Sequence, residues 1–347
     1  MEPHELYMRR CFELAELGSG HVAPNPLVGC ILVRDGDIVG EGWHKHFGGP
    51  HAEVHALADA VSRHGEDVLH TSTLYVNLEP CSHFGKTPPC ADLLISRGIR
   101  KVMISNTDPF ESVQGNGIRR MRDAGIEVVT GILDTEGAFL NRRFFTFHLQ
   151  KRPYIVLKFA RSADNFIAPE TTSSGIHWIS GPLSRKLVHK WRTEESAIMV
   201  GSATALHDNP HLTARDWPGK SPLRIVVDRE GKLPARLHLF DQQVPTVVFT
   251  ATTRTGGHNL EFVQLKPDEH FIQNIFKELH RRNILSVMVE GGRRLIDLLS
   301  AESLWDEARI FTSPVPLERG IAAPALVGKV IRQETIGSDS LTWMMRK

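Results

Sequence analysis

Three side chains in the first third of the chain could hold a metal ion, and a carboxylate lies beside one of them. The three are the imidazole of His51 and the thiols of Cys81 and Cys90, and Glu53 follows His51 after one intervening residue. A structural zinc site is normally closed by four protein ligands, whereas a catalytic site keeps three and leaves a position for water. Three ligands and an unassigned carboxylate therefore indicate a catalytic zinc site.

The chemistry of such a site follows from the metal and the carboxylate. Zinc lowers the pKa of bound water from about 15.7 to about 7, so hydroxide is available at neutral pH. Glu53 would move protons between that water and the substrate. Zinc deaminases of nucleobases use a His-x-Glu motif followed by Pro-Cys-x-x-Cys, with the glutamate not a ligand. Here eight residues instead of two separate Cys81 from Cys90, so a loop is inserted between the thiols.

A structural zinc site is the alternative that the residues leave open. It would need a fourth ligand from a nearby histidine. The candidates are His44, His46, His55 and His83. His55 shares a helical face with His51, because the two are four residues apart, but we expect it to be packed or exposed rather than a ligand. The unassigned carboxylate of Glu53 favours catalysis over a closed site.

Composition limits the fold and the partners. A chain of 347 residues suggests two domains at about 150 residues each. The apolar content of 41% and charged content of 23% are those of an ordinary globular protein. A net charge of +1 gives no argument for a nucleic-acid or membrane partner, and no apolar run reaches the ~18 residues of a membrane span. Without an apolar signal segment at the start, we expect a cytoplasmic location with Cys11 and Cys30 reduced.

Predicted helices and strands alternate through the first half. Strands are expected at 28–33, 38–42, 74–78, 101–105 and 126–129, and helices at 5–17, 51–64, 90–97 and 115–123. The strand at 74–78 delivers Pro80 and Cys81 at its carboxyl end, where open α/β sheets place their ligands. Cys90 begins a helix, whose N-terminus favours a thiolate. This order predicts a three-layer α/β domain over residues 1–146.

A second alternating series predicts another α/β domain over residues 147–347. Strands are expected at 154–160, 197–200, 223–227, 246–250, 286–289 and 307–311, and helices at 184–192, 271–282 and 293–299. The turn Glu290-Gly291-Gly292 joins a buried strand to a helix, where glycines let backbone amides approach a phosphate. A plain tight turn would give the same pattern. A Rossmann domain is not indicated, because no G-x-G-x-x-G opens a strand–helix unit.

The loop between the two thiols carries a family resemblance. The stretches that match are PCSHFGKTPPC at 80–90, HAEVHAL at 51–57 and APNPLVGC at 23–30. They resemble the deaminase half of the bifunctional deaminase/reductase of riboflavin biosynthesis, which implies a cytidine-deaminase-like fold. The resemblance places four residues at the deaminase substrate: Asn25, His44, His83 and Lys86. We expect His83 and Lys86 to hold a ribose phosphate.

The second half resembles the reductase half of the same family. The matching positions are Lys158, Ser162, Asp164, 178–180, Arg192, 201–204, 208–215, 227–228 and 290–292. The resemblance implies a dihydrofolate-reductase-like domain that uses NADPH. It places the cofactor on Arg161, Trp178, Thr204, Asp208, Gly292, Arg293, Arg294, Leu295, Ile296, Asp297 and Leu298. It places the reductase substrate on Ile176, Arg192, Leu212, Arg215 and Glu290.

Six positions depart from the family pattern, and one of them is Ala163, where leucine is usual. Asn165 stands where glycine is usual, and asparagine tolerates a positive φ better than most residues. Arg161 replaces a small residue, and Ile176 stands where a polar substrate contact is common. Phe110 and His207 also differ from the residues that the family usually has there. The second half therefore matches the family less closely than the first.

The favoured hypothesis is a bifunctional enzyme with Zn²⁺ and NADPH, acting on a small-molecule pyrimidine ribose phosphate. It would deaminate 2,5-diamino-6-ribosylamino-4(3H)-pyrimidinone 5′-phosphate and then reduce the ribosyl side chain to ribityl. We expect a homo-oligomer with no nucleic-acid or membrane partner. Two other hypotheses remain open. One is a deaminase of nucleic-acid bases, against which the absence of a basic stripe argues. The other is a zinc-stabilised scaffold whose second domain only binds a nucleotide.

Overall fold

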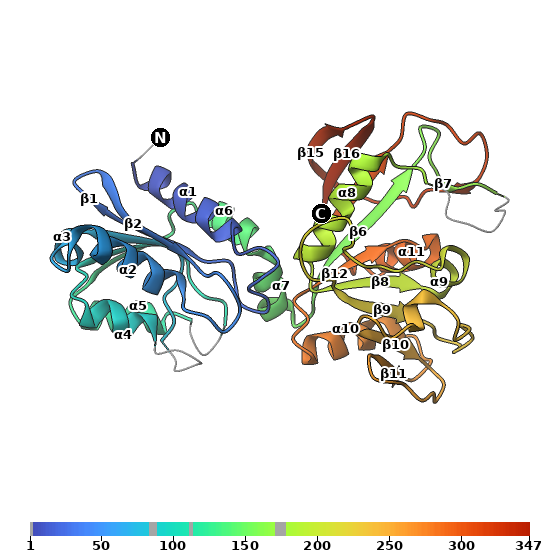
Figure 1. The fold of residues 1–347 in the computed structure, drawn as a ribbon, viewed down its shortest axis with the longest axis horizontal. Coiled ribbons are helices and arrows are strands. Elements are labelled where there is room, and N and C mark those ends of the chain that lie inside the picture. Colours follow the sequence, from blue (N-terminus) through green and yellow to red (C-terminus); the bar gives the residue numbers. More distant parts are fainter. Residues whose placement is uncertain (1–2, 83–88, 111–113, 171–177) are drawn as a thin grey trace. The chain divides into compact units, whose positions relative to one another are not determined.

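A computed structural model describes residues 3–82, 89–110, 114–170 and 178–347. The chain divides into two units, Met1–Lys151 and Arg152–Lys347, drawn in blue to green and in green to red (Figure 1). The predicted boundary after residue 146 falls inside helix α7 (Arg142–Gln150). This helix buries Phe144 and Phe147, three residues apart on one face, and it continues as a single element to residue 150.

The first unit is a five-stranded sheet in the order β2-β1-β3-β4-β5. Its strands are β1 (Gly29–Arg34), β2 (Asp37–Trp43), β3 (Thr73–Leu78), β4 (Lys101–Asn106) and β5 (Glu127–Thr130). Strand β1 is antiparallel to β2 and β3, whereas β3, β4 and β5 run parallel. Asp35 and Gly36 have φ of 54° and 91°, and two positive φ values are what a tight hairpin turn requires, as predicted.

Helices cover both faces of this sheet (Figure 1). They are α1 (Pro3–Glu16), α2 (Ala52–His64), α3 (Val68–Thr71), α4 (Cys90–Ser96), α5 (Asn116–Asp123) and α6 (Asp134–Leu140). Neighbouring residues of β1 point to opposite faces. Leu32 joins the core under α2, α4 and α5, and Ile31 joins the core under α1. Two cores on the two faces give the predicted three-layer α/β domain.

The second unit is a nine-stranded sheet in the order β11-β10-β9-β8-β12-β6-β13-β16-β15. The strands are β6 (Tyr154–Arg161), β8 (Ala197–Gly201), β9 (Leu223–Val227), β10 (Thr246–Thr250), β11 (Leu260–Gln264), β12 (Ser286–Glu290), β13 (Glu307–Thr312), β15 (Gly328–Ile336) and β16 (Asp339–Arg346). All run parallel from β11 to β13, and the hairpin β15–β16 is added antiparallel. Strands β7 (Phe166–Ala168) and β14 (Ile321–Ala322) form a separate pair.

The helices of the second unit also cover both faces of its sheet. They are α8 (Pro182–Glu194), α9 (Ser202–Asp208), α10 (Phe271–Arg281) and α11 (Arg293–Ala301), with a short 3-10 helix η1 (His238–Phe240). Along β6, Ile155 joins the core under α10 and α11, and Val156 joins the core under α8. Asn165 has φ of 72°, which confirms that it takes a glycine-like backbone conformation. No helix within the described ranges combines the length and apolarity that a membrane span needs.

Candidate functional site

His51, Cys81 and Cys90 meet at the carboxyl end of β3. His51 is the N-cap of α2, Cys81 follows the end of β3, and Cys90 is the first residue of α4. One ligand atom from each lies within 4.8 Å of the other two. The Nδ1 atom of His51 is 3.6 Å from Sγ of Cys81 and 3.3 Å from Sγ of Cys90. Residues far apart in the chain thus converge on one point.

The donor set and its distances fit a tetrahedral zinc ion. With Zn–S bonds of about 2.3 Å and Zn–N bonds of about 2.0–2.1 Å, tetrahedral geometry places a ligand sulfur and the ligand nitrogen about 3.5 Å apart. Within the described ranges, His51, Cys81 and Cys90 are the only His, Cys, Asp or Glu side chains that belong to this metal-ligand group. His44, one proposed fourth ligand, has Nδ1 3.0 Å from the Pro50 carbonyl and Nε2 3.1 Å from Nδ2 of Asn25. Among the described residues, the site therefore keeps three protein ligands.

The neighbouring side chains of Cys90 and His51 favour the thiolate form of Cys81. Hydrogen bonds from Cys90 and from His51 lower the pKa of Cys81 to about 4. The backbone N–H of Cys90, at the start of α4, donates to Sγ of Cys81 over 3.3 Å. The pKa of the Cys90 thiol is raised by its hydrogen bond to Cys81 and by burial. The backbone N–H at the start of α4 is therefore directed to Cys81 and not to the thiol of Cys90 itself.

Glu53 is buried beside this cluster, with 3% of its surface exposed. Burial raises its pKa, and the charge of His51 opposes that change. Residues two apart on a helix point about 200° from each other. His51, however, has an extended backbone with φ −76° and ψ 169°, and the helix begins only at Ala52. The carboxyl of Glu53 therefore reaches the thiol of Cys90, and a buried carboxyl at such a site suits proton transfer.

Asn25 and His44, predicted at the deaminase substrate, lie next to the cluster. The ring of His44 meets that of His51 edge-on, with centroids 5.3 Å apart. Because the Pro50 carbonyl accepts from Nδ1, Nε2 of His44 is an acceptor and the Asn25 amide donates to it. Burial lowers the pKa of His44, which agrees with this neutral tautomer. His83 and Lys86, the other two predicted contacts, fall outside the described residues.

Glu79 is a buried carboxylate that the sequence analysis did not single out. It precedes Pro80 and Cys81 directly and is 4% exposed. Its oxygens accept four backbone N–H bonds, from Asp108 (3.2 Å), Gly115 (3.0 Å), Gly117 (2.9 Å) and Ile118 (3.2 Å). These bonds fix the Cys81 turn against the N-terminus of α5, where a negative charge is favourable. The sequence signal that could have identified Glu79 is an acidic residue directly before Pro-Cys.

A second group of charged side chains lies at the carboxyl end of β12. Arg192 binds Glu290 through both oxygens, with Nε–Oε1 of 2.7 Å and Nη2–Oε2 of 2.8 Å. Lys158, opposite Glu290 on the neighbouring strand, has Nζ 4.0 Å from Oε2. Burial raises the pKa of Glu290, but the charges of Arg192 and Lys158 outweigh it and bring that pKa to about 2. Burial lowers the pKa of Lys158, which the sequence analysis matched to the family without giving it a role.

The loop that follows α9 contacts the Arg192–Glu290–Lys158 group through a backbone carbonyl. Nη1 of Arg192 donates to the carbonyl of Thr213 over 2.9 Å. The side chain of Leu212 is only 2% exposed and packs in the core, so a ligand can reach mainly its backbone. Arg215 is exposed, and its nearest acidic atom, Oδ2 of Asp216, is 4.0 Å away. Ile176, another predicted substrate contact, falls outside the described residues.

Two glycines and Thr204 form the turn predicted to meet the cofactor. Gly291 and Gly292 have φ of 90° and 77°, a conformation that L side chains rarely adopt. A Cβ on Gly292 would lie 3.1 Å from Oγ1 of Thr204, so the turn and α9 are close. In the following helix, Leu295 and Ile296 are buried in the core, which leaves only their backbone for a ligand.

The remaining predicted cofactor residues are spread around this end of the sheet. Arg294 and Leu298 are exposed, and Arg293 pairs with Asp297 over 2.5 Å. Trp178 is 54% exposed, with the Arg185 guanidinium 4.8 Å from its ring centroid. Arg161 donates to Thr312 and Asn165, each over 3.0 Å. Burial raises the pKa of Asp208.

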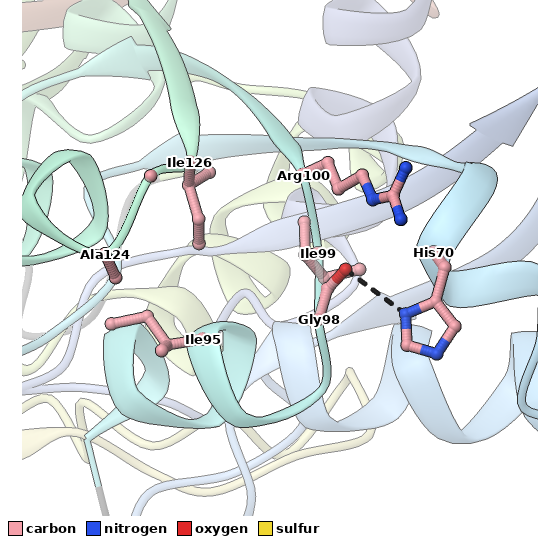
Figure 2. A pocket seen from close by; sticks show the side chains of 8 residues that line it. His70, Ile95, Gly98, Ile99, Arg100, Ala124 and Ile126 are labelled. Atoms are coloured by element: carbon pink, nitrogen blue, oxygen red, sulfur yellow. Dashed lines mark hydrogen bonds between the residues drawn. The ribbon is translucent and has the colours of Figure 1, made fainter.

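A pocket of about 270 Å³ lies elsewhere in the first unit (Figure 2). It is lined by His70, Ile95, Gly98, Ile99, Arg100, Ala124, Gly125 and Ile126. Arg100 precedes the first residue of β4, whereas Cys81 follows the last residue of β3, and the two strands are parallel. The pocket therefore lies at the opposite edge of the sheet from the metal-ligand cluster and is not part of the candidate site.

Family comparisons agree with this division of the chain. Residues 1–106 match the cytidine and deoxycytidylate deaminase zinc-binding region, and residues 153–334 match the RibD C-terminal domain. The fold and the two residue groups thus define a zinc-binding deaminase domain followed by a reductase domain.

Similar proteins extend the match to the whole length. The chain is 40% identical to the riboflavin biosynthesis protein RibD of Aquifex aeolicus, over 98% of both chains. It is 37% identical to a Thermotoga maritima structure described as a diaminohydroxyphosphoribosylaminopyrimidine deaminase/5-amino-6-(5-phosphoribosylamino)uracil reductase, with a TM-score of 0.89 over 99% of both chains. An Acinetobacter baumannii RibD structure is 29% identical, with a TM-score of 0.88. The chain belongs to the RibD family, and it is a bifunctional deaminase and reductase of riboflavin biosynthesis.

Proposed function

We propose that the first domain deaminates 2,5-diamino-6-ribosylamino-4(3H)-pyrimidinone 5′-phosphate by hydrolysis. The second domain then reduces the ribosyl side chain with NADPH, which gives 5-amino-6-ribitylamino-uracil 5′-phosphate. The observation that carries this proposal is the group His51, Cys81 and Cys90 with Glu53 buried beside it. The described activities of the similar Thermotoga maritima protein support the choice of substrates.

In the deaminase, each residue has a separate task. His51, Cys81 and Cys90 hold zinc, which when bound lowers the pKa of water to about 7. Glu53 accepts the proton of the attacking water and passes it to the amine, so that the ring C–N bond breaks and ammonia leaves. Asn25 orients the pyrimidine: its amide N–H donates to His44, and its carbonyl oxygen, which accepts from no donor in the described part of the chain, would accept from a ring N–H. His83 and Lys86 would hold the ribose phosphate.

In the reductase, NADPH supplies the hydride and the protein supplies orientation and charge. The sugar ring opens to give a C1′=N imine, hydride adds to C1′, and a proton must reach the nitrogen. We assign that proton to Lys158, because burial lowers its pKa and Glu290 holds it in place. Arg215 suits the substrate phosphate, since a guanidinium binds phosphate through two hydrogen bonds. The turn at Gly292, with Thr204, Asp208, Trp178 and Arg161 around it, would take NADPH.

Replacing Glu53 with glutamine tests the deaminase mechanism. Because glutamine keeps the shape but cannot carry the proton, we expect ammonia release to fall by about 10² to 10⁴-fold while zinc stays bound. Ammonia, bound zinc and NADPH oxidation with deaminated substrate would be measured on one preparation. Glu66→Gln, at an exposed ion pair with Arg97, is the matched control and should behave as wild type. Undiminished ammonia release in Glu53→Gln would rule out the proposed role.

Substrate and cofactor choice need a separate measurement. We expect the wild-type protein to release ammonia from the small pyrimidine but not from single-stranded nucleic acid, and to oxidise NADPH in preference to NADH. Deamination of the nucleic acid at a comparable rate would favour the base-deaminase hypothesis instead. We also expect a homo-oligomer, which sedimentation of the same sample would test.

A further inference from the structure

The loop after α9 holds one residue in an unusual backbone conformation. Leu212 has φ of 52°, a region that residues other than glycine rarely enter. The carbonyl before it, on His211, accepts from Nη1 of Arg224 over 3.3 Å. The carbonyl after it, on Thr213, accepts from Nη1 of Arg192 over 2.9 Å. Such a conformation persists only when its surroundings fix it, and here two arginines do so from either side.

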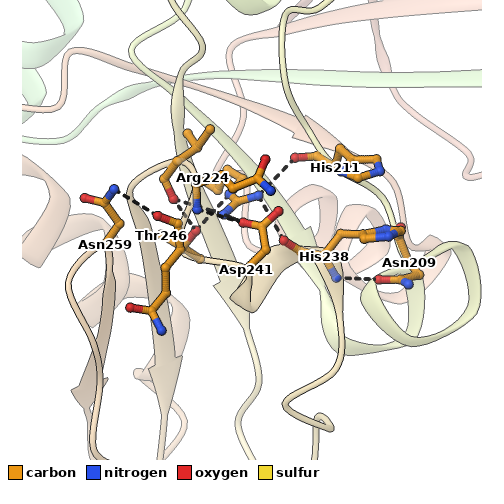
Figure 3. A network of polar contacts seen from close by, with 10 residues as sticks. Asn209, His211, Arg224, His238, Asp241, Thr246 and Asn259 are labelled. Atoms are coloured by element: carbon orange, nitrogen blue, oxygen red, sulfur yellow. Dashed lines mark hydrogen bonds and ion pairs between the residues drawn. The ribbon is translucent and has the colours of Figure 1, made fainter.

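Arg224, on β9, is fully buried and uses every one of its N–H groups (Figure 3). A guanidinium has five N–H donors. The acceptors are Oγ1 of Thr246 (2.8 Å), the carbonyls of His211 (3.3 Å), His238 (3.1 Å) and Val244 (2.9 Å), and Oδ1 of Asp241 (2.9 Å). One buried cation therefore ties the loop to η1 and to the segment that precedes β10.

The start of the loop is fixed to the same network. The backbone N–H of His238 donates to Oδ1 of Asn209, and the His238 ring nitrogen Nδ1 donates to the Asn209 carbonyl, both over 2.8 Å. The rings of His211 and His238 stack with centroids 3.8 Å apart (Figure 3). Asn209 and Leu212, both with positive φ, are thus each held by a residue of this network.

What the loop offers a ligand is backbone. The side chain of Leu212 lies in the core, and the N–H groups of Leu212 and Thr213 donate to no acceptor among the described residues. Arg192, which holds the Thr213 carbonyl, also binds Glu290. The Thr213 carbonyl therefore lies next to the Arg192–Glu290 pair, and the backbone before it is held in its conformation with the help of Arg224.

We propose that Arg224 is a positioning residue of the reductase, which acts through residues 211–213 to aim this backbone at the substrate. The proposal rests on the proposed reductase function. If the His211 carbonyl were released, Leu212 could relax to negative φ and its amide would turn away. The consequence is a loss of substrate affinity rather than of cofactor affinity.

Arg224→Lys tests the proposal, because lysine keeps the charge for Asp241 but cannot span all five acceptors. We expect the KM for the pyrimidine substrate to rise about tenfold or more, the usual effect of losing a charged hydrogen bond. The KM for NADPH and the ammonia release of the other domain should stay within about twofold. Thr246→Val is the matched control, since it removes one acceptor of Arg224 on the side away from the loop.

Active-site titration separates this from a general loss of folding. A smaller active fraction with unchanged pyrimidine KM would overturn the proposal and make Arg224 merely structural. A parallel rise of both KM values, or an equal effect of Thr246→Val, would also overturn it. If the wild-type protein fails to oxidise NADPH with the deaminated substrate, the proposed function is wrong and this proposal falls with it, whereas an effect confined to the variant concerns this proposal alone.

Discussion

Glu79 and Glu290 are two buried carboxylates that are stabilised by different partners. Glu79 accepts four backbone N–H bonds, whereas Glu290 is paired with Arg192 and Lys158. The first arrangement fixes the backbone near the metal-ligand cluster, and the second maintains a charge where the reductase site is proposed. A buried charge is stable only with such partners. The partners of each carboxylate therefore indicate which property changes when the pairing is removed.

Glu79→Ala should destabilise the deaminase domain without removing any proposed ligand. Four backbone amides would lose their acceptor, and we expect a loss of about 3 kcal/mol in the free energy of unfolding. Hydrogen exchange of the α5 amides would show it. Glu127→Ala, at an exposed ion pair with Lys101, is the control and should change that free energy by less than about 0.5 kcal/mol. Unchanged protection of α5 would contradict the anchoring role of Glu79.

Arg192→Gln should make the reductase sensitive to acid. In the native protein the pKa of Glu290 is about 2, below its ordinary value, so the stability from this pair is complete above about pH 4.5. That stability is lost as the pH falls toward 2. Without Arg192, burial raises the pKa of Glu290, and the acidic limb of reductase kcat/KM should move to higher pH.

The pH profile of NADPH oxidation between pH 4 and 8 would measure this shift. Arg281→Gln, which removes an exposed ion pair with Glu278, is the control and should keep the wild-type profile. A profile for Arg192→Gln that is lower but unshifted would show that Arg192 does not set the charge of Glu290.

At the scale of elements, the least predictable part of the fold is the C-terminal hairpin β15–β16. Most residues of β15 are exposed, so its sequence lacks the apolar alternation of a half-buried strand. Strand β16 nevertheless pairs with β13 and brings Leu341 into the core under α8. Helices α3, α6, α7 and α9 were missed as well, and they are between four and nine residues long. Short helices depend on tertiary packing more than on their own periodicity.

Leu341→Ala tests how much this hairpin contributes. The side chain is fully buried, so a loss of about 2–5 kcal/mol is expected from the cavity and the lost apolar contact. The temperature at which the protein loses its NADPH oxidation activity on heating should be lower than in the wild type. Ammonia release should be unaffected. Ile331→Ala, at a 41% exposed position on β15, should change little. Equal shifts for the two variants would mean that β16 is not part of the core.

At the scale of the molecule, each unit has its own sheet and its own pair of cores. The metal-ligand cluster belongs to the first unit and the Arg192–Glu290–Lys158 group to the second. We therefore expect each activity to depend on the residues of one unit, so that removing what one activity needs leaves the other intact.

Zinc removal by a chelator should separate the two activities. We expect ammonia release to be lost, because His51, Cys81 and Cys90 would hold no ion, while NADPH oxidation with deaminated substrate stays within about twofold. Adding zinc back should restore ammonia release. Loss of both activities on chelation would show that zinc also supports the reductase.

Residue types and their spacing along the chain were enough to identify the classes of chemistry and the order of the domains. His-x-Glu, Pro-Cys and the second cysteine identified the candidate ligands, because residue type and spacing are local properties of the chain. Alternating apolar patterns placed most strands and helices, since a buried strand or helix face requires them. The structure confirmed the predicted three-layer domain. It also gave Asn165 a positive φ, which asparagine tolerates better than most residues.

How these residues contact one another became known only from the folded structure. It placed the carboxyl of Glu53 beside Cys90 through the extended backbone at His51, and it directed the helix amide to Cys81. It also showed that Leu212 offers backbone instead of its side chain. The physical reason is that hydrogen bonds and burial join residues far apart in the chain, and their directions exist only once the strands and helices have packed.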